Sequence, residues 1–259
     1  MAAQGSNDFI ASKFAKNFIE GLAVSVASTT TLSVAVGSCR DSTNDQNIDL
    51  PVAKTLNFGV VGLNGIDTGV IGASKLYYVF AIADSLDTEG LENPAGVIAS
   101  LSATPVLPIG STGRPYDIYR RIGWARTGAG STLLTMYQSG NGNIRQYTYD
   151  TMIAVLASGT SQTLAAIDLS VACPPLDNLN WQAHVEFTPA TAGDTVKFTP
   201  FGSTATLIQG ISGVVAAVKQ TEQVRLLAKL DAGVPKTLYI NSAAVCDSDI
   251  WCSGFQDVV

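Results

Sequence analysis

The chain is poor in charged residues and has a single histidine, and both shortages limit what it can do. Only 14% of its 259 residues are charged, against about 25% in an ordinary globular domain. It has 15 Lys and Arg, which form no basic tract, and the formal net charge is −6. We therefore expect no nucleic-acid partner, because binding phosphates requires a concentrated basic surface.

Long apolar runs are also missing. No run approaches the roughly 20 residues that a membrane-spanning helix needs, and residues 1–5 are small and polar with no apolar signal region after them. Neither membrane insertion nor secretion is expected. Hydrophobic residues still make up 46% of the chain, which is too many for a disordered protein. The length allows one large β domain or two domains of about 100–150 residues.

The sequence offers little for catalysis. His184 lies in a stretch that alternates apolar and polar residues, so we interpret it as a polar residue on a strand face. The alternative, a general base or metal ligand, lacks an orienting partner and further ligands. No phosphate-binding loop, dinucleotide fingerprint, nucleophile elbow or zinc pattern occurs. We expect no catalytic residue, no cofactor and no metal site.

The four cysteines, Cys39, Cys173, Cys246 and Cys252, are not spaced as a C-x-x-C motif. Without a secretory signal, reduced and buried thiols are the favoured interpretation. Two alternatives stay open: a disulfide between Cys246 and Cys252 that closes a small loop, or a disulfide between Cys39 and Cys173.

Residues 7–20 are the best helix candidate. Asn7 or Asp8 can cap the helix, and Gly21 follows as a stop signal. One apolar stripe runs along it, formed by Phe9, Ile10, Phe14 and Phe18. This stripe either folds back on its own domain or docks on a neighbouring subunit. We interpret residues 1–21 as a helical anchoring segment, and we expect its deletion to leave the β domain folded.

After Gly21 the pattern changes to a period of two residues, which indicates strands. Expected strands lie at residues 22–26, 31–36, 54–58, 75–83, 96–101, 117–126, 132–139, 143–149, 161–171, 181–187, 195–201, 223–230 and 236–241. Residues 75–82 are nearly all apolar, so both of their faces should be covered. Residues 37–49 read as a polar loop. The Asn141-Gly142 pair predicts a hairpin, and residues 232–235 predict a tight turn.

Many short strands at short intervals predict a sandwich or barrel architecture. We expect an all-β protein of two β-sandwich, jelly-roll-like units with a short N-terminal helix. The predicted domains are residues 22–150 and 151–259, with residues 150–160 as a hinge between them.

The central part of the chain resembles a known group of proteins. Residues 116–127 contain a Tyr-Arg-Arg-Ile-Gly strand, residues 137–142 contain a Gln-Ser-Gly turn, and an aromatic strand follows at residues 147–150. This pattern resembles a module of tailed-bacteriophage virion proteins, which are named tail fibre, head fibre or structural protein. Residues 32–42 and 65–69 resemble the same group, and the resemblance covers residues 22–205.

The resemblance implies a non-enzymatic structural component of a bacteriophage virion, a tail fibre or tail- or baseplate-associated protein anchored by its N-terminal region. The first alternative is a capsid decoration or head-fibre protein, and the second is a lectin-like receptor-binding protein for host glycans. The implied partners are copies of the chain itself in a homotrimer and other virion proteins. The implied location is the virion, assembled in the host bacterial cytoplasm. A polysaccharide-cutting enzyme would need two paired carboxylates, and none lies in a recognisable motif.

Arg120, Arg121 and Trp124 are the residues that we single out as a junction between sheets. Neighbours in a strand point to opposite faces, so one arginine should point inward and need a carboxylate or carbonyl partner. The alternative is that the pair binds an acidic glycan or a phosphate. Trp124 and the surrounding tyrosines indicate core and cross-strand packing, with a subunit interface or a sugar-stacking platform as alternatives.

Overall fold

The structure is a computed structural model, and it describes residues 17–87, 91–140, 142–203, 209–243 and 245–259. Eighteen strands and no helix form within these residues, which confirms the predicted all-β class. The described part of the chain thus holds no helix that could cross a membrane.

The chain divides into two compact units. The first takes the described residues up to Leu134, together with Gln138–Arg145 and Val258–Val259, and the second takes Thr135–Tyr137 and Gln146–Asp257. The second unit is therefore an insertion into the first along the chain. The sequence had placed the boundary at residue 150, inside what is now the second unit.

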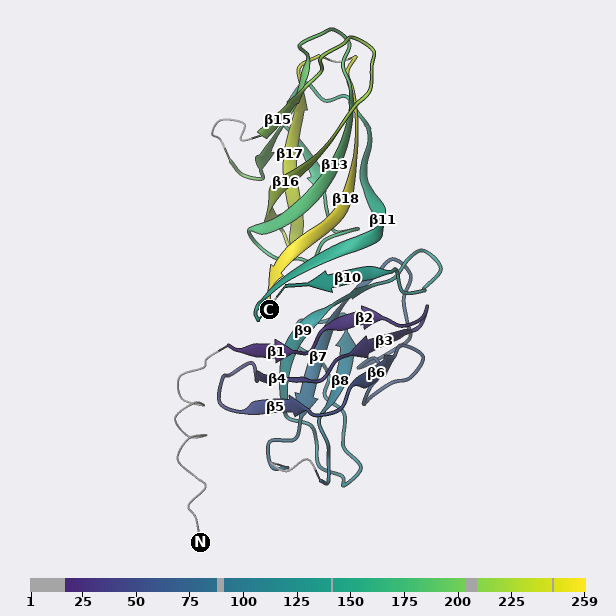
Figure 1. The fold of residues 1–259 in the computed structure, drawn as a ribbon, viewed down its shortest axis with the longest axis vertical. Helices are drawn as coiled ribbons and strands as arrows, with labels where there is room; N and C mark the ends of the chain where they lie inside the picture. Colours follow the sequence, from purple (N-terminus) through teal and green to yellow (C-terminus); the bar gives the residue numbers. More distant parts are fainter. Residues whose placement is uncertain (1–16, 88–90, 141, 204–208, 244) are drawn as a thin grey trace. The chain divides into compact units, whose positions relative to one another are not determined.

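The first unit contains three antiparallel sheets of three strands each, in the orders β1-β4-β5, β2-β3-β6 and β8-β7-β9 (Figure 1). Their bounds are β1 Ile19–Gly21, β2 Val24–Val26, β3 Thr31–Val34, β4 Gly37–Arg40, β5 Asn47–Leu50, β6 Lys54–Asn57, β7 Leu76–Ala83, β8 Gly96–Ser100 and β9 Ile118–Arg126. One apolar cluster takes side chains from all three sheets, among them Leu32, Ile48 and Val79. Strand β7 lies between β8 and β9, and most of its residues are buried, as predicted.

The helix prediction for residues 7–20 is wrong at its C-terminal end. Ile19–Gly21 form β1, which pairs with β4, and Ile19 is buried in the core of the first unit. The tertiary pairing with β4 outweighs the local helical pattern here. The remainder of that prediction, residues 7–16, lies outside the described residues.

Residues 37–49 are a second correction, because they form β4 and β5 rather than an irregular loop. Asp41 lies in the loop between these strands, and its carboxylate holds that loop in a tight turn. Its carboxylate accepts hydrogen bonds from the backbone N–H groups of Asp45 (2.8 Å) and Gln46 (2.9 Å) and from the Thr43 hydroxyl. This local network lets a polar sequence turn tightly enough for two short strands to pair.

The second unit is built on one sheet in the order β10-β11-β18-β13-β16-β17-β14-β15, with β12 paired to β17. The bounds are β10 Met136–Ser139, β11 Ile144–Gly159, β12 Ala165–Asp168, β13 Leu179–Thr188, β14 Thr195–Pro200, β15 Gln209–Ser212, β16 Gln220–Asp231, β17 Val234–Asn241 and β18 Asp247–Val258. Figure 1 shows the long strands of this unit side by side. The predicted hinge at residues 150–160 is wrong, because β11 continues through Gly159.

Strict alternation sorts the side chains of the long strands. On β13, Trp181, Ala183, Val185 and Phe187 are fully buried, while the alternate residues Gln182, His184 and Glu186 are partly exposed. Strands β17 and β18 alternate in a similar way. The predicted turn between β16 and β17 is confirmed, and its residues Ala232 and Gly233 both have positive φ, at 50° and 82°. The sheet therefore has one core face and one face of polar side chains.

Candidate functional site

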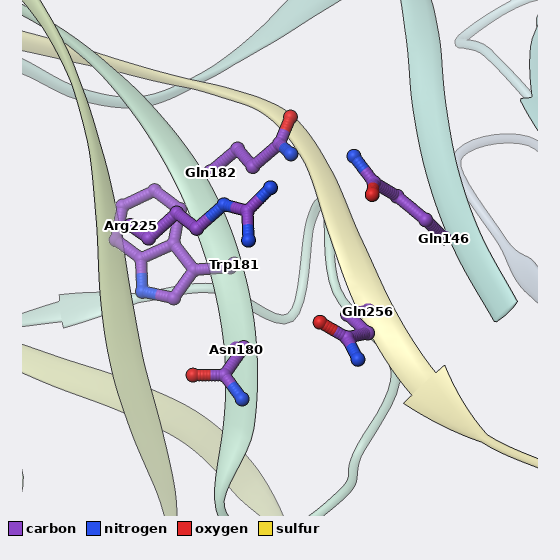
Figure 2. Close-up of a pocket in the computed structure, with 6 residues that line it drawn as sticks. All are labelled: Gln146, Asn180, Trp181, Gln182, Arg225 and Gln256. Carbon is purple, nitrogen blue, oxygen red and sulfur yellow. The ribbon is translucent and has the colours of Figure 1, made fainter. Parts of the chain in front are cut away.

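The polar face of the second unit carries a shallow hollow. The hollow is open to solvent, and its volume as a cavity is only about 10 Å³, so a ligand larger than a water molecule would lie over it rather than inside it. It is lined by Gln146 of β11, Asn180, Trp181 and Gln182 of β13, Arg225 of β16 and Gln256 of β18. Figure 2 shows the four amides and the guanidinium arranged around this space. Four neighbouring strands thus contribute to one site.

The strand register explains why these side chains lie together. Gln182 is opposite Arg225 on one side, and Asn180 is opposite Gln256 on the other. Gln182 also faces Gly254 of β18, where the backbone of Tyr147 and Thr148 on β11 occupies the place of a side chain. A β-bulge at this point shifts the register of β13 and β18. Cross-strand neighbours on one face have Cβ atoms about 5 Å apart, so Gln182 and Arg225 can contact one ligand group together, and Asn180 and Gln256 can do the same.

None of these five polar side chains makes a hydrogen bond or ion pair with another group of the described residues. Trp181 differs, because its ring is buried and its Nε1 donates to the Thr237 hydroxyl at 3.0 Å. Its ring thus belongs to the core face of β13, opposite the face of Asn180 and Gln182. No carboxylate lines the hollow, so its only formal charge is that of Arg225.

An aromatic pair lies further along the same face. His184 is opposite Trp251 in the register of β13 and β18, with ring centroids 5.8 Å apart and an angle of 60° between the planes. Both residues are partly exposed. His184 is two residues beyond Gln182 on β13, which is about 7 Å along a strand. His184 is thus on a strand face, as expected, and its Nε2 lies 3.9 Å from Glu186 Oε1.

The two adjacent arginines of the predicted junction lie in the first unit, on β9. Arg120 donates to the carbonyl oxygen of Val259 at 2.8 Å, and Arg121 donates to that of Val258 at 2.8 Å. The Arg121 guanidinium also lies 4.9 Å from the centre of the buried Trp124 ring. Burial lowers the pKa of Arg120 from its usual value. Both guanidinium groups are thus engaged with the backbone of the chain.

The four cysteines are buried and free. The alternative disulfide between Cys246 and Cys252 is wrong for a geometric reason: Cys252 lies six residues further along the chain, and β18 runs extended between them, about 20 Å at the rise of a strand. Sγ of Cys252 lies instead 3.7 Å from Sγ of Cys173. The other alternative, between Cys39 and Cys173, is not formed either. Burial raises the pKa of the Cys39 thiol to about 12.

The apolar stripe of the N-terminal segment cannot be followed as a whole. Phe9, Ile10 and Phe14 lie outside the described residues. Phe18 is partly buried just before β1, and its carbonyl accepts a hydrogen bond from the backbone N–H of Arg40.

The first unit has an exposed group of aliphatic side chains, which we call the aliphatic loop surface. Residues 58–67 cover the edge of β8, where Asn64 N–H donates to the Val97 carbonyl and Asp67 N–H donates to that of Ala99, both at 2.8 Å. Asp67 also accepts a hydrogen bond from the backbone N–H of Val106 (3.1 Å). The two adjacent segments leave five aliphatic side chains exposed: Val60, Val61, Leu63, Val106 and Ile109.

Sequence reasoning missed both surfaces. The hollow is made of amides at alternate positions of strands that lie far apart along the chain, and their spacing resembles that of any solvated strand face. The one available signal was the unusual row Asn180-x-Gln182 next to a buried tryptophan. The aliphatic loop surface had a clearer signal, because valines in a glycine-rich loop have no strand to bury them.

The comparisons with known proteins give little further information. No family model matches the chain, and no curated protein matches it. Similar solved structures include a carbohydrate-binding module of Cellvibrio mixtus lichenase 5A in complex with cellotriose (TM-score 0.22, 12% identity, 49% of this chain and 87% of that one). Two others are from Bacillus thuringiensis: the Cry1Da tryptic core variant (TM-score 0.24, 10% identity, 92% and 51%) and the mosquito-larvicidal Cry4Aa toxin (0.22, 10%, 96% and 55%). TM-scores at this level assign neither a fold family nor a function.

Proposed function

We propose that the chain is a non-enzymatic structural component of a bacteriophage virion, a tail fibre or a tail- or baseplate-associated protein. In this role it assembles with copies of itself and with other virion proteins. The motif resemblance over residues 116–150 supports the proposal. So does the low charge, because a surface of hydroxyl and amide groups suits packing in an assembly better than free diffusion.

The aliphatic loop surface is the structural observation that carries the proposal. Val61 is 62% exposed and Ile109 is 72% exposed, although both belong to segments that are hydrogen-bonded to a well-packed unit. Single exposed aliphatic residues are ordinary on a protein surface, but groups of them mark contacts with other proteins. We assign this surface to the contact with a neighbouring protein of the particle. A capsid decoration or head-fibre protein would use the same surface at a different site on the particle.

Density-gradient fractionation of particles tests this function. The wild-type chain should co-sediment with assembled particles, and immunogold labelling should place it on the tail. Recovery of the chain only in the free fractions would overturn the virion role, and labelling of the head would favour the alternative location.

The contact itself is tested by the double substitution Val61→Asp with Ile109→Asp. We expect a folded protein that is lost from particles, because two carboxylates cannot be buried in an apolar contact without partners. Val52→Asp is the matched control, since Val52 is 64% exposed in the first unit but lies outside this surface. Normal incorporation of the double variant would contradict this use of the surface.

The N-terminal anchoring hypothesis needs a shorter deletion than the sequence suggested. Removing residues 1–21 would delete β1 and the buried Ile19, so a failure to incorporate would reflect damage to the fold. Removal of residues 1–16 leaves β1 intact. If these residues anchor the chain, that variant should fold normally and be absent from particles, whereas normal incorporation would refute the anchoring role.

A further inference from the structure

We propose that the hollow on the polar face of the second unit is a binding site for an acidic saccharide, a sugar ring that carries a carboxylate. This site is independent of the virion role, because it can be tested on the isolated chain. Its parts are Gln146, Asn180, Gln182, Arg225 and Gln256, with the partly exposed Trp251 beside them.

The five polar groups of the hollow are available to a ligand. The carboxylates and hydroxyls that hold loops elsewhere in the second unit are engaged: Asp194, for example, accepts hydrogen bonds from Thr191 N–H (2.7 Å) and from the Ser242 hydroxyl (3.0 Å). Within the described residues, the polar groups of the hollow have no such partners. They do not hold the fold together, and their hydrogen-bonding capacity is directed to solvent or to a ligand.

The amides of the hollow match the hydrogen-bonding pattern of a sugar. Each amide presents one carbonyl acceptor and two N–H donors on a flat group. A sugar hydroxyl both donates and accepts a hydrogen bond, so neighbouring hydroxyls on a ring match neighbouring amides well. Figure 2 shows the amides of Gln146, Gln182 and Gln256 on different sides of the same space. A ring placed there can be contacted from β11, β13 and β18 at once.

The charge of the hollow favours an acidic ligand. Arg225 is the only charged group in the hollow, and no carboxylate lines it. A guanidinium binds a carboxylate with two parallel hydrogen bonds, which gives more strength and direction than a hydroxyl can. In a chain with a net charge of −6, an unpaired arginine among four amides selects an anionic ligand over a cationic one.

An aromatic side chain lies further along the same strand face. Trp251 lies on the same face and packs against His184, whose ring tilts at 60° to it. Tryptophan offers a flat apolar surface together with a polar N–H, and the C–H face of a sugar ring can pack on it. Since this position is about two residues along the strand from Gln182, a second sugar of the same polymer can reach it. The site therefore fits a short stretch of acidic polysaccharide.

Isothermal titration calorimetry with the purified full chain tests the proposal. The ligands are oligosaccharides of polygalacturonate, alginate, hyaluronate and polysialate, with fully methyl-esterified oligogalacturonate and dextran as uncharged counterparts. At least one acidic oligosaccharide should bind. The affinity of its neutral counterpart should be lower by about tenfold or more. Binding should also weaken as salt is raised, because Arg225 is exposed and salt screens charge interactions at the surface.

Three variants locate the site. Arg225→Met and Gln182→Ala should each weaken binding of the acidic ligand, the former by about tenfold or more, while circular dichroism and the thermal midpoint stay unchanged. Lys229→Met is the matched control, because it removes an exposed positive charge from the same strand, β16, outside the hollow. Trp251→Phe should reduce the affinity for oligosaccharides of two or more sugars and leave the affinity for a single acidic sugar unchanged.

Four outcomes would overturn the inference: no binding of any acidic oligosaccharide at millimolar concentration, equal binding of the neutral counterparts, binding that Arg225→Met leaves unchanged, or equal losses from Lys229→Met. None of these results bears on incorporation into particles, so this inference and the virion role can fail separately.

Discussion

The two units solve the burial of polar groups in different ways. In the first unit the buried polar residues include ionised side chains, namely Arg40, Asp41, Asp84, Arg126 and Arg145. In the second unit they are mostly hydroxyl and amide groups, namely Thr199, Thr237, Asn241 and Ser248, with Asp257 as an exception among the described residues. The unit with the smaller sheets thus uses buried charged side chains to hold its loops, whereas the unit with the larger sheet uses few.

Three short sheets leave the first unit with many connections to hold in place. The buried carboxylate of Asp84 illustrates the solution: it accepts hydrogen bonds from the side chain of Asn93 (2.9 Å) and the backbone N–H of Leu86 (3.0 Å), and pairs with Arg114 at 2.9 Å. Arg145 likewise donates to the Gly21 carbonyl at 2.8 Å. Charged groups are strong hydrogen-bonding partners, so a few of them can fix many turns.

The second unit relies on long strands and aromatic packing. Tyr147 stacks on Phe255 with centroids 4.9 Å apart, and Trp181 and Phe187 are fully buried beneath β13. Hydrogen bonds between the strands satisfy most backbone groups of this unit. Polar side chains on its solvent-facing surface are therefore not needed to hold the backbone in place. The hollow is lined by side chains of this kind.

The largest effect in this comparison is expected from Trp181→Ala. Truncating a fully buried tryptophan should cost about 3–5 kcal/mol of unfolding free energy, and the loss should fall on the second unit. Hydrogen exchange under native conditions should speed up in peptides from β13 and β16 but not in those from β7 and β9. Equal acceleration in both units would show that they unfold as one and would remove the contrast drawn here.

A smaller loss is expected from Gly254→Ala. A Cβ at this position would lie 2.0 Å from the Tyr147 carbonyl oxygen, so β18 and β11 would have to separate. Overpacking of this kind costs about 1–3 kcal/mol, measurable by urea denaturation. Gly130→Ala in the first unit is the control, since a Cβ there meets nothing nearer than Thr132 Oγ1 at 4.0 Å. Similar losses in both variants would contradict the close-packing argument.

Arg120→Met should cost somewhat less, about 1–2 kcal/mol. It removes the charged hydrogen bond to the Val259 carbonyl, and the remaining exposure of the side chain limits the loss. The first unit alone should be affected, as shown by hydrogen exchange of β7 and β9. Arg225→Met in the second unit, where the guanidinium has no partner in the described chain, should leave stability within about 0.5 kcal/mol.

Acidification should destabilise the first unit before the second, and neither unit should lose stability at neutral pH. Hydrogen bonds from Asn93 and neighbouring groups lower the pKa of Asp84, and backbone N–H groups lower the pKa of Asp87. For Asp41, burial raises the pKa but the hydrogen bonds from Gln46, Thr43 and Asp45 outweigh it. In the second unit, hydrogen bonds from Thr191, Ser242 and Cys246 lower the pKa of Asp194.

A carboxyl whose pKa is lowered by folding stabilises the protein above its ordinary pKa of 3.8 and loses that effect as the pH falls below it. The first unit, with three such groups, should therefore lose its hydrogen-exchange protection first between about pH 4 and pH 2. Asp84→Asn should lessen this dependence. Earlier acid unfolding of the second unit would be the opposite of what we expect.

Much of the fold could be predicted because period-two alternation is a local signal. The strands expected at residues 75–83 and 117–126 agree with β7 and β9 to within one residue at each end. Strands β1, β4 and β5 could not be predicted, since each is short and is formed by pairing between segments distant along the chain or by a loop network such as that of Asp41. The apolar pattern before Gly21 favoured a helix, and only the pairing with β4 overrides it.

The candidate site was beyond the reach of sequence alone. Asn180, Gln182, Arg225 and Gln256 become neighbours through the antiparallel register of three strands and one bulge, and no local pattern encodes that register. The arginine pair of β9 was visible as a motif, yet its partners, the carbonyls of Val258 and Val259, lie far away in the chain.

The position of Val259 in the structure affects the order in which the two units can fold. Its side chain is buried in the core of the first unit, and its N–H donates to the Asn143 carbonyl at 2.7 Å. A ribosome produces this residue only after every strand of the inserted unit. The first unit therefore cannot close its core until Val258 and Val259 have been synthesised, whereas the strands of the inserted unit are already complete by then.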